Sequence, residues 1–343
     1  MKQHQPNTLK IELTEGCNLR CKMCGIQGIR EKAGGPFSYM TLETAQVVAG
    51  LLADTSWTSK VEFAMRGEPL MNPNAATIVR MFRTALPRSQ LMLTTNGLPL
   101  LRGQKVRANC LELFDAGLNI LAIDCYKPSK KVEDAVRADI IEGFWERAGV
   151  TAKDYPSDES PYHKYSHRGK RIFLIEDFEA AAVAAKAVGT KVVENHAGAA
   201  YPPTPEPLAK RCARPFREFT VRWDGRVNLC CNDWRGAYKI GQLGEDFKSI
   251  DAAWNSGPLQ VARKMLYDRD RAFSPCDVCD NISYRVGFLP DPSGQETLPP
   301  PTKRERDAAR GYGAGAPMTR PVPREWEAGR GKLLPTIKIK VVK

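Results

Sequence analysis

Three cysteines lie close together near the start of the chain, in the spacing C-x3-C-x2-C: Cys17, Cys21 and Cys24. They follow an extended apolar run at 9–13 that stops just before Gly16. A loop at the end of a strand can fold three thiolates around one metal centre. Three thiolates are one too few to saturate a [4Fe–4S] cluster. The fourth iron would stay open, and an open metal position is typical of a catalytic site.

A zinc knuckle is the simplest alternative for this loop. It would need a fourth ligand from nearby, because structural zinc sites are almost always four-coordinate. No histidine or cysteine lies between Cys24 and Cys110. The sequence therefore favours iron at the three cysteines, with one position left for a reactant.

Short polar motifs end three of the apolar runs that follow. They read RGEPL at 66–70, TTNG at 94–97 and Ile-Asp at 123–124. Together with the cysteine loop they resemble, in the same order, the strand-end motifs of the radical S-adenosylmethionine (radical SAM) enzymes, among them Gly-Gly-Glu-Pro and Thr-Asn-Gly. Each match is short, but four in order identify the chain as a member of that superfamily.

The resemblance implies a cofactor set and a reaction. In radical SAM enzymes the open iron binds the amino and carboxylate groups of SAM, and an electron from a partner such as flavodoxin or ferredoxin leads to a 5′-deoxyadenosyl radical that takes hydrogen from substrate. Gly67 would let the backbone approach SAM, and the segment with Glu68 would meet its ammonium group. The resemblance implies further contacts with SAM or substrate for Met23, Thr95, Asn96, Asp124 and Asn195.

Two positions depart from the family pattern. The residue before the third cysteine, which in the family usually carries an aromatic side chain near the adenine, is Met23. Methionine is polarizable and packs on ring faces, so we expect it to take that place. The first glycine of the Gly-Gly-Glu-Pro motif is Arg66. No SAM-binding role is carried over to that side chain.

Alternating strands and helices predict the fold of residues 1–200. β-like runs lie at 9–13, 60–65, 90–94, 119–124, 171–175 and 191–194, and helix-like stretches include 41–53, 74–85, 105–116 and 177–188. Such alternation implies parallel strands with helical crossovers. It matches the α/β partial (β/α)6 TIM-type barrel of the radical SAM family, in which chemistry gathers at the carboxyl ends of the strands. The candidates that fall at those ends are Cys17, Glu68, Asn96, Asp124 and Asn195.

A second cysteine set follows a proline-rich linker, within a region that we predict to be a small α+β domain at 201–287. The stretch FTVRWDGRVNLC predicts a β-hairpin that turns at Asp-Gly and delivers Cys230 at its end. Two helices and a final C-x2-C complete a pattern that resembles the SPASM auxiliary-cluster domain. No cysteine follows Cys279, so the resemblance is to the shortened, twitch form. The implied ligands of one auxiliary [4Fe–4S] cluster are Cys212, Cys230, Cys276 and Cys279.

Three cysteine assignments remain open at this stage. A structural zinc ribbon also uses four cysteines ending in C-x2-C, and only the radical SAM loop favours iron. Cys231 should not be a ligand if Cys230 is one, because neighbouring residues on a strand point to opposite faces. Cys125 follows Asp124 and could return a hydrogen atom to a substrate radical, or it could be an apolar filler.

Composition limits location and partners. Ten cysteines without a signal-peptide core predict a cytoplasmic chain with metal ligands or free thiols rather than disulfides. We expect no membrane association, because no apolar run reaches the length of a transmembrane helix. The net charge is +12. A Pro/Gly-rich basic tail at 288–343 would carry much of it, either as a solubilising end or as a contact for nucleic acid.

The sequence leaves three catalytic hypotheses and one non-catalytic hypothesis. The first is a radical SAM oxidoreductase or isomerase acting on a small molecule with help from the auxiliary cluster. The second is modification or rearrangement of a nucleotide or a DNA base adduct, as in phage-type members of the family. The third is maturation of a ribosomal peptide, which is disfavoured because only a short segment precedes Cys17. A metal-binding scaffold would hold zinc at the second site and would not cleave SAM.

Overall fold

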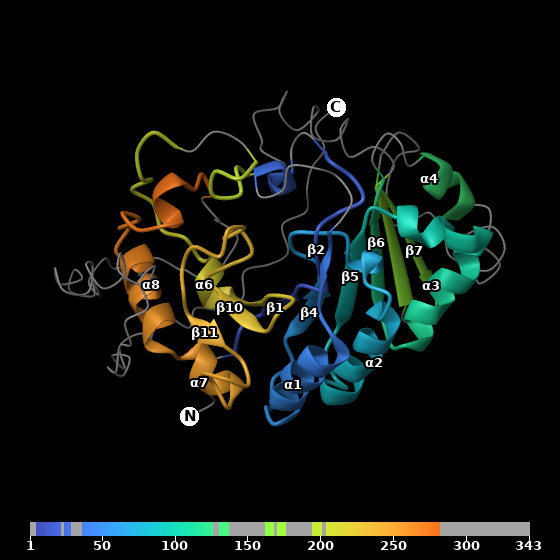
Figure 1. The fold of residues 1–343 in the computed structure, drawn as a ribbon, viewed down its shortest axis with the longest axis horizontal. Helices are drawn as coiled ribbons and strands as arrows, with labels where there is room; N and C mark the ends of the chain where they lie inside the picture. The colour runs from blue at the N-terminus through green and yellow to red at the C-terminus, as the bar shows by residue number, and fades with distance from the viewer. Residues whose placement is uncertain are drawn as a thin grey trace.

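A nine-stranded mixed sheet forms the centre of the computed structural model, which describes residues 5–21, 24–28, 36–125, 130–136, 162–167, 170–175, 194–200 and 204–281. Within these ranges the strand order is β11-β10-β9-β1-β4-β5-β6-β8-β7 (Figure 1). A separate two-stranded sheet pairs β2 (Thr14–Glu15) with β3 (Ser38–Tyr39) and lies at the carboxyl end of β1.

The middle of the large sheet is the parallel array expected for a partial barrel. Each neighbouring pair among its five consecutive strands is parallel. These strands confirm five of the six predicted runs to within two residues. The predicted helix at 177–188 lies outside the described residues, as does the predicted strand at 191–194 apart from Glu194. The five strands are β1 (Thr8–Ile11), β4 (Lys60–Phe63), β5 (Leu91–Thr95), β6 (Ile120–Asp124) and β8 (Lys170–Ile175).

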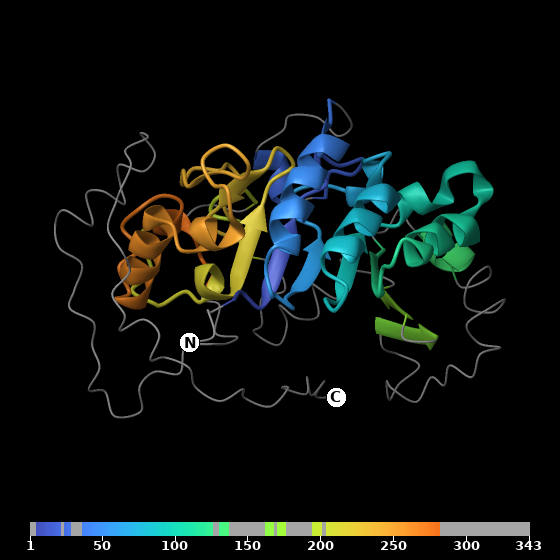
Figure 2. The same ribbon diagram turned by 90° about the horizontal axis from the view of Figure 1, so that it is seen from below.

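Helices cover one face of this sheet, and the opposite face lines the barrel interior (Figure 2). Three of them are α1 (Leu42–Ala53), α2 (Ala75–Ala85) and α3 (Val106–Asp115), which agree with the predicted helices. Alternate strand residues such as Leu9 and Phe63 face these helices and are fully buried. On β1 and β4 the intervening residues, such as Lys10 and Glu62, are polar and only partly buried, so the pleat of these two strands separates an apolar outer face from a polar interior.

The region with the second cysteine set continues the same sheet. The predicted hairpin is present as β9 (Glu218–Val221) and β10 (Arg226–Asn228), with Gly225 at a φ of +84° in the turn. β9 pairs in parallel with β1, so that Phe219 lies opposite Leu9. This pairing covers the edge that β1 would otherwise expose. The sequence did not predict that the two regions share one sheet.

The hydrophobic core is also shared between the two regions. α7 (Ile250–Trp254) and α8 (Gly257–Tyr267) are the two predicted helices after the hairpin. The Trp254 ring makes edge contacts with Trp57 and Phe219 at centroid distances of 6.3 and 5.9 Å. Such aromatic pairs add to the free energy gained from apolar burial. The auxiliary region is therefore held to the barrel by core packing as well as by strand pairing.

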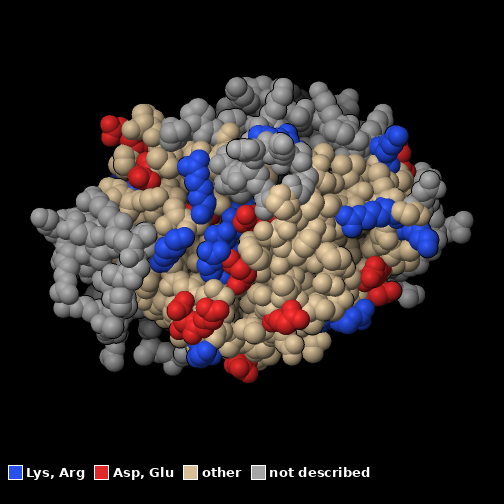
Figure 3. Space-filling model, viewed as in Figure 1, with Lys and Arg blue, Asp and Glu red and all other residues tan. Residues whose placement is uncertain are grey.

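The remaining described elements are short or lie at the sheet edge. They include β7 (Tyr162–His167), antiparallel to β8, and β11 (Gly241–Gln242), with helices α4 (Lys130–Val136) and α6 (Arg214–Arg217). Short 3-10 helices lie at Gly25–Gly28, Pro69–Met71, Leu98–Gln104 and Cys276–Val278. No helix in the described part of the chain is long and apolar enough to cross a membrane. On the face shown in Figure 3, basic and acidic side chains are interspersed. The basic tail at 288–343 lies outside the described residues, and so does Met23.

Candidate active site

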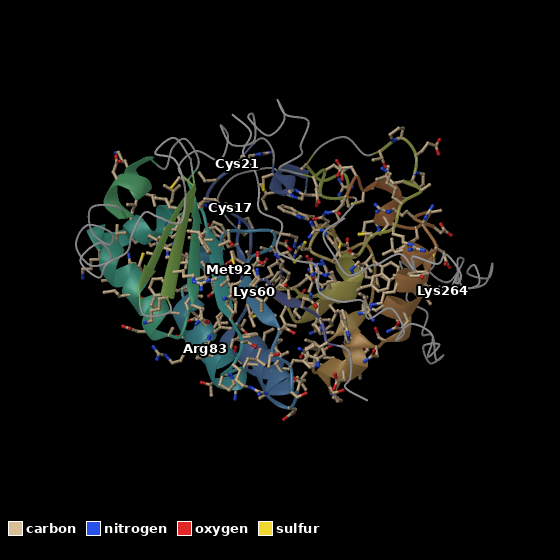
Figure 4. The ribbon with its side chains drawn as sticks, turned by 180° about the vertical axis from the view of Figure 1, so that it is seen from behind. Cys17, Cys21, Lys60, Arg83, Met92 and Lys264 are labelled. Carbon is tan, nitrogen blue, oxygen red and sulfur yellow. The ribbon has the colours of Figure 1, made fainter. Side chains whose placement is uncertain are left out.

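The three-cysteine loop begins where β2 ends, at the carboxyl edge of the barrel strands. Figure 4 shows Cys17 and Cys21 at this edge, with Lys60 and Met92 farther down the strands. The N–H of Cys24 donates to the carbonyl of Cys21 at 3.0 Å and closes the loop into a turn. All three thiols are partly buried. The three predicted ligands thus lie on one loop at the carboxyl edge of the barrel strands.

Four of the predicted cluster ligands share a local hydrogen bond that the sequence analysis missed. In each case the backbone N–H two residues later donates to the thiol: Leu19 to Cys17, Ile26 to Cys24, Arg214 to Cys212 and Asn281 to Cys279. Hydrogen bonds to ligand sulfurs stabilise the thiolate and help to set the potential of a cluster. Burial acts in the other direction and, with the nearby Glu68 carboxylate and the other two thiols, raises the pKa of Cys17 to about 12 despite the Leu19 donor. A bound metal would supply the charge that overcomes this burial.

Glu68 ties the ends of two barrel strands together. Its carboxylate accepts from the Thr95 hydroxyl at 2.6 Å and from the N–H groups of Asn96 and Leu70 at 2.7 and 3.0 Å. The residue is 2% exposed, and burial raises its pKa to about 7 despite these donors. The side chain therefore organises the strand ends that would hold SAM. A direct contact of the 67–68 segment with the SAM ammonium group stays a prediction.

Asn96 connects these strand ends to the cysteine loop. Its side-chain N–H group donates to the Asn18 carbonyl oxygen at 2.8 Å and lies 3.6 Å from the Cys17 sulfur. Its own side-chain oxygen accepts from the N–H of Leu98. The motif residue thus positions the loop through side-chain contacts with Asn18 and Cys17. The sequence placed Asn96 at the right strand end but did not predict these partners.

Gly67 is required by the protein backbone itself. A Cβ at this position would lie 2.3 Å from the Gly16 carbonyl oxygen and 2.4 Å from that of Thr14. The N–H of Glu68 also donates to the Gly16 oxygen at 3.0 Å. The expected reason for this glycine was close approach to SAM. The structure supplies a different reason, because the strand before the cysteine loop packs directly on it.

Arg66, the departure from the family motif, is the centre of a buried ion network. Its guanidinium donates to both carboxylate oxygens of Glu12 at 2.7 and 2.5 Å and pairs with Glu15 at 2.5 Å. Arg222, from the auxiliary region, also pairs with Glu15 at 3.0 Å. The carbonyl of Trp234 accepts from Arg66 at 2.8 Å. The network therefore joins the strand before the cysteine loop to the auxiliary region.

Trp234, whose carbonyl accepts from Arg66, also packs near the cysteine loop. Its ring stacks on His196 with centroids 4.5 Å apart, and Cys17 and Cys24 pack against the small hydrophobic cluster to which it belongs. Burial lowers the pKa of His196 to about 4, so the ring is neutral at pH 7 and its Nδ1 accepts from the N–H of Gly25 at 3.2 Å. The sequence offered no signal for this contact, because Trp234 lies far from the loop along the chain.

Two family profiles match the chain, one over the three-cysteine loop and one over the second cysteine set. Residues 11–149 match the Radical SAM superfamily, and residues 212–280 match SPASM, an iron–sulfur cluster-binding domain. The chain thus carries a radical SAM domain followed by a SPASM domain. SAM and a [4Fe–4S] cluster are the cofactors of the first domain, and an auxiliary iron–sulfur cluster is that of the second.

Several relatives match only part of the chain, and they are GTP 3′,8-cyclases. The Streptomyces coelicolor enzyme is 29% identical over 141 residues, which are 40% of this chain and 39% of that enzyme. The Peptoclostridium acidaminophilum enzyme is 35% identical over 127 residues, which are 36% of each. The Moorella thermoacetica enzyme is 35% identical over 97 residues, covering 28% of this chain and 29% of that enzyme. The chain spans less than half the length of these relatives.

The fold of this chain is similar to that of a solved structure. A crystal structure of BtrN in complex with AdoMet and 2-DOIA superimposes with a TM-score of 0.58 and 18% identity, covering 82% of this chain and 96% of that one. A second BtrN structure, in an open conformation, superimposes with a TM-score of 0.53 and 17% identity. At this identity the likeness shows the fold, including the partial barrel.

The second cysteine set surrounds one cavity. Its lining includes Cys212, Cys230, Cys276 and Cys279 together with Arg214, Arg271 and Asn281. Each of the four thiols belongs to a residue no more than 8% exposed. The four-thiol donor set fits the iron–sulfur cluster that the SPASM match implies.

Cys231 lies beside this cavity but does not line it. Its sulfur accepts from Arg214 at 3.0 Å, while Cys230 lines the cavity. We expect Cys230→Ala to lower the iron content of the reconstituted protein by about four and Cys231→Ala to leave it unchanged. Iron and sulfide assays of the two variants, prepared side by side without oxygen, check this. An equal loss of iron in both would assign Cys231 as a ligand.

The polar barrel interior carries charged groups on neighbouring strands. Lys10 and Lys60 both pair with Glu62, at 2.6 and 3.0 Å. Burial alone would raise the pKa of Glu62, but the two ammonium groups lower it to about 2. Burial and nearby Glu62 raise the pKa of Asp124, at the end of β6, to about 7. A group that is half protonated at neutral pH suits hydrogen bonding to a sugar or substrate hydroxyl, and this role stays a prediction.

Replacing Glu62 by glutamine is expected to lower the free energy of unfolding by about 3 kcal/mol at pH 7. The carboxylate has a depressed pKa in the folded protein, so its stabilisation is present above the unfolded-state pKa and is lost as the pH falls toward 2. The difference between wild type and variant should therefore shrink by more than half between pH 7 and pH 3. Urea unfolding at both pH values measures it. A difference that is constant with pH would contradict the ion-pair explanation.

Two candidates take positions that differ from those expected for catalysis. Cys125 is fully buried in the main hydrophobic core, on the helix-facing side of β6 rather than in the barrel interior. Asn195 is 1% exposed, and its side chain donates to the Val278 carbonyl at 2.7 Å and accepts from the N–H of Asp280 at 3.2 Å. It therefore holds the C-x2-C turn of the auxiliary region. A hydrogen-donor role for Cys125 and a SAM contact for Asn195 have no support in this geometry.

Proposed function

We propose that this protein oxidises a small polar substrate by removing a hydrogen atom from it inside the partial barrel. When bound, SAM and the two clusters supply the cleaving electron, the 5′-deoxyadenosyl radical and an acceptor for the electron that the substrate radical gives up. Loss of a hydrogen atom, an electron and a proton amounts to a two-electron oxidation of the substrate. The protein supplies position and exclusion of water.

The observation that carries this proposal is the burial of four cysteines around a single cavity. Cys212, Cys230, Cys276 and Cys279 would saturate a [4Fe–4S] cluster, and each is at most 8% exposed. A cluster held in this way has no open position for substrate. Accepting an electron suits such a site better than binding the reactant, which favours oxidation over a substrate-ligating role.

The chain's own residues prepare the first site in three ways. The partly buried loop presents three thiolates at the carboxyl edge of the barrel. Glu68 holds the ends of β4 and β5 in place through Thr95 and Asn96. Asn96 then orients the loop through Asn18. In the interior, Lys10, Glu62 and Asp124 offer both charges and hydrogen-bonding groups to a polar molecule.

The test is anaerobic reconstitution followed by iron, sulfide and zinc analysis and an assay of 5′-deoxyadenosine under reductant. We expect about eight irons in wild type and about four in the variant Cys17→Ala, Cys21→Ala, Cys24→Ala, in which SAM cleavage is abolished. About four irons with one zinc would make the auxiliary region structural. A fully loaded wild type that forms no 5′-deoxyadenosine would refute the enzyme proposal.

A nucleotide substrate is the second candidate. It is favoured by the partial matches to GTP 3′,8-cyclases, which cover 40% and 36% of this chain. The discriminating assay adds GTP, other nucleoside triphosphates or small polyols to the reducing mixture and measures the rate of 5′-deoxyadenosine formation. A rise of tenfold or more with one nucleotide alone would favour this candidate, and no response to any nucleotide would remove it.

A further inference from the structure

The cavity of the auxiliary region contains unpaired hydrogen-bonding groups as well as thiols. Ten buried side-chain atoms in the described residues lack a hydrogen-bond partner, and three of them belong to residues that line this cavity. They are Nε of Arg214 and both amide atoms of Asn281. An unpaired buried polar group costs about 1–3 kcal/mol. Groups concentrated in this way around one cavity need partners from whatever fills it.

Asn281 is held so that its amide stays at the cavity. The residue is 1% exposed, and its carbonyl accepts from Arg271 Nη1 at 2.6 Å. Its backbone N–H donates to the Cys279 thiol. The main chain is therefore tied on both sides of the Cα atom, and only the side-chain amide remains without a partner. That amide offers two N–H donors next to a predicted cluster ligand.

Both terminal nitrogens of Arg214 donate hydrogen bonds, and only its Nε lacks a hydrogen-bond partner. Nη1 donates to Glu218 at 3.1 Å and to the Cys231 sulfur at 3.0 Å, and Nη2 donates to Glu194 at 3.0 Å. Two carboxylates thus fix the plane of the guanidinium. Its backbone N–H donates to the Cys212 thiol, as that of Asn281 does to Cys279. The two residues hold equivalent places beside two of the four cysteines.

We propose that Arg214 Nε and the Asn281 amide donate hydrogen bonds to the auxiliary cluster and raise its reduction potential. The inference rests on the proposed function only in that the cavity holds an iron–sulfur cluster. A cluster gains negative charge on reduction, so N–H donors and a guanidinium stabilise its reduced form more than its oxidised form. Hydrogen bonds to sulfur and nearby charge are known controls of cluster potential. Both residues act as positioning and tuning groups that make the cluster a better electron acceptor.

The test uses the full chain with Cys17→Ala, Cys21→Ala and Cys24→Ala, so that only the auxiliary site can load. Its iron and zinc content is measured first, and then its midpoint potential by redox titration followed by electron paramagnetic resonance. Arg214→Gln and Asn281→Leu should each shift the redox equilibrium about tenfold toward the oxidised form, which is about 59 mV for a one-electron couple. Arg214→Lys, which keeps the charge but lacks Nε–H, should shift it less.

Arg226→Gln is the matched control. It removes the same charge from the hairpin of the same region, where Arg226 pairs with Asp224 and is 45% exposed. Its midpoint should equal that of the parent. Midpoints equal to that of the parent in Arg214→Gln and Asn281→Leu at full iron content would overturn the proposal, as would zinc in place of iron. If one variant does not take up the auxiliary cluster, the midpoint potentials of the other variant and of Arg214→Lys decide between the two outcomes.

This outcome is separate from the fate of the proposed function. SAM cleavage is assayed in protein that retains the three loop cysteines, whereas the potential is measured in protein that lacks them. Shifted potentials without SAM cleavage in the wild type would leave the inference standing and remove the proposed reaction. SAM cleavage by the wild type together with unshifted potentials in the variants would remove the inference and leave the proposed reaction standing.

Discussion

Replacing Arg66 by methionine should destabilise the protein by about 3–5 kcal/mol, because it leaves Glu12 charged and buried without its partner. Glu12 is fully buried and accepts two hydrogen bonds from the Arg66 guanidinium. Thermal unfolding without oxygen measures the effect, which for a chain of this size corresponds to a fall in Tm on the order of 10 °C. Methionine keeps much of the volume, so the loss reports on charge and hydrogen bonds rather than on a cavity.

Two further variants make this result specific. Combining Arg66→Met with Glu12→Gln should recover part of the loss, because it removes the uncompensated charge. Arg226→Met applies the same chemical change to an exposed ion pair and should cost less than about 1 kcal/mol. An Arg66→Met protein as stable as the wild type would show that the network contributes nothing. The variant should also lose the first cluster faster to a chelator, because Arg66 holds Trp234 against the cysteine loop.

Replacing Gly67 by alanine is expected to prevent the cysteine loop from taking its place. The added Cβ would lie 2.3–2.4 Å from two backbone oxygens, and neither Gly16 nor Thr14 can move without shifting β2. Overpacking of this kind typically costs 1–3 kcal/mol, and more where backbone is involved. We expect the iron content after reconstitution to fall from about eight to about four, with SAM cleavage lost.

Gly50 is the matched control for this substitution. It lies within α1 and has no atom within 4 Å of an added Cβ. Alanine there should stabilise the helix by about 0.4–1 kcal/mol, since it reduces the freedom of the unfolded chain without strain. A Gly67→Ala protein with full iron content and wild-type Tm would contradict the close packing of β2 on this glycine.

Residues that interact within a few positions were predictable from the sequence. The three-cysteine loop, the hairpin at Asp224-Gly225 and the helix with Thr41 at its N-cap are set by local spacing and local hydrogen bonds. The alternation of strands and helices identified the barrel for the same reason. The order of the motifs then indicated which strand ends would lie at one edge of the sheet, because parallel strands end together.

Contacts between distant segments were decided by the tertiary structure alone. The pairing of β9 with β1, the network around Arg66 and the stacking of Trp234 on His196 join residues up to about two hundred positions apart. The packing of the Gly16 and Thr14 backbone on position 67, which requires glycine there, was also decided by the tertiary structure alone. Sequence spacing carries no information on such contacts, because the free energy that selects them comes from burial and charge pairing after the chain has closed on itself. Residue types and local spacing thus determined which chemistry the chain can support, and tertiary packing decided which side chains position it.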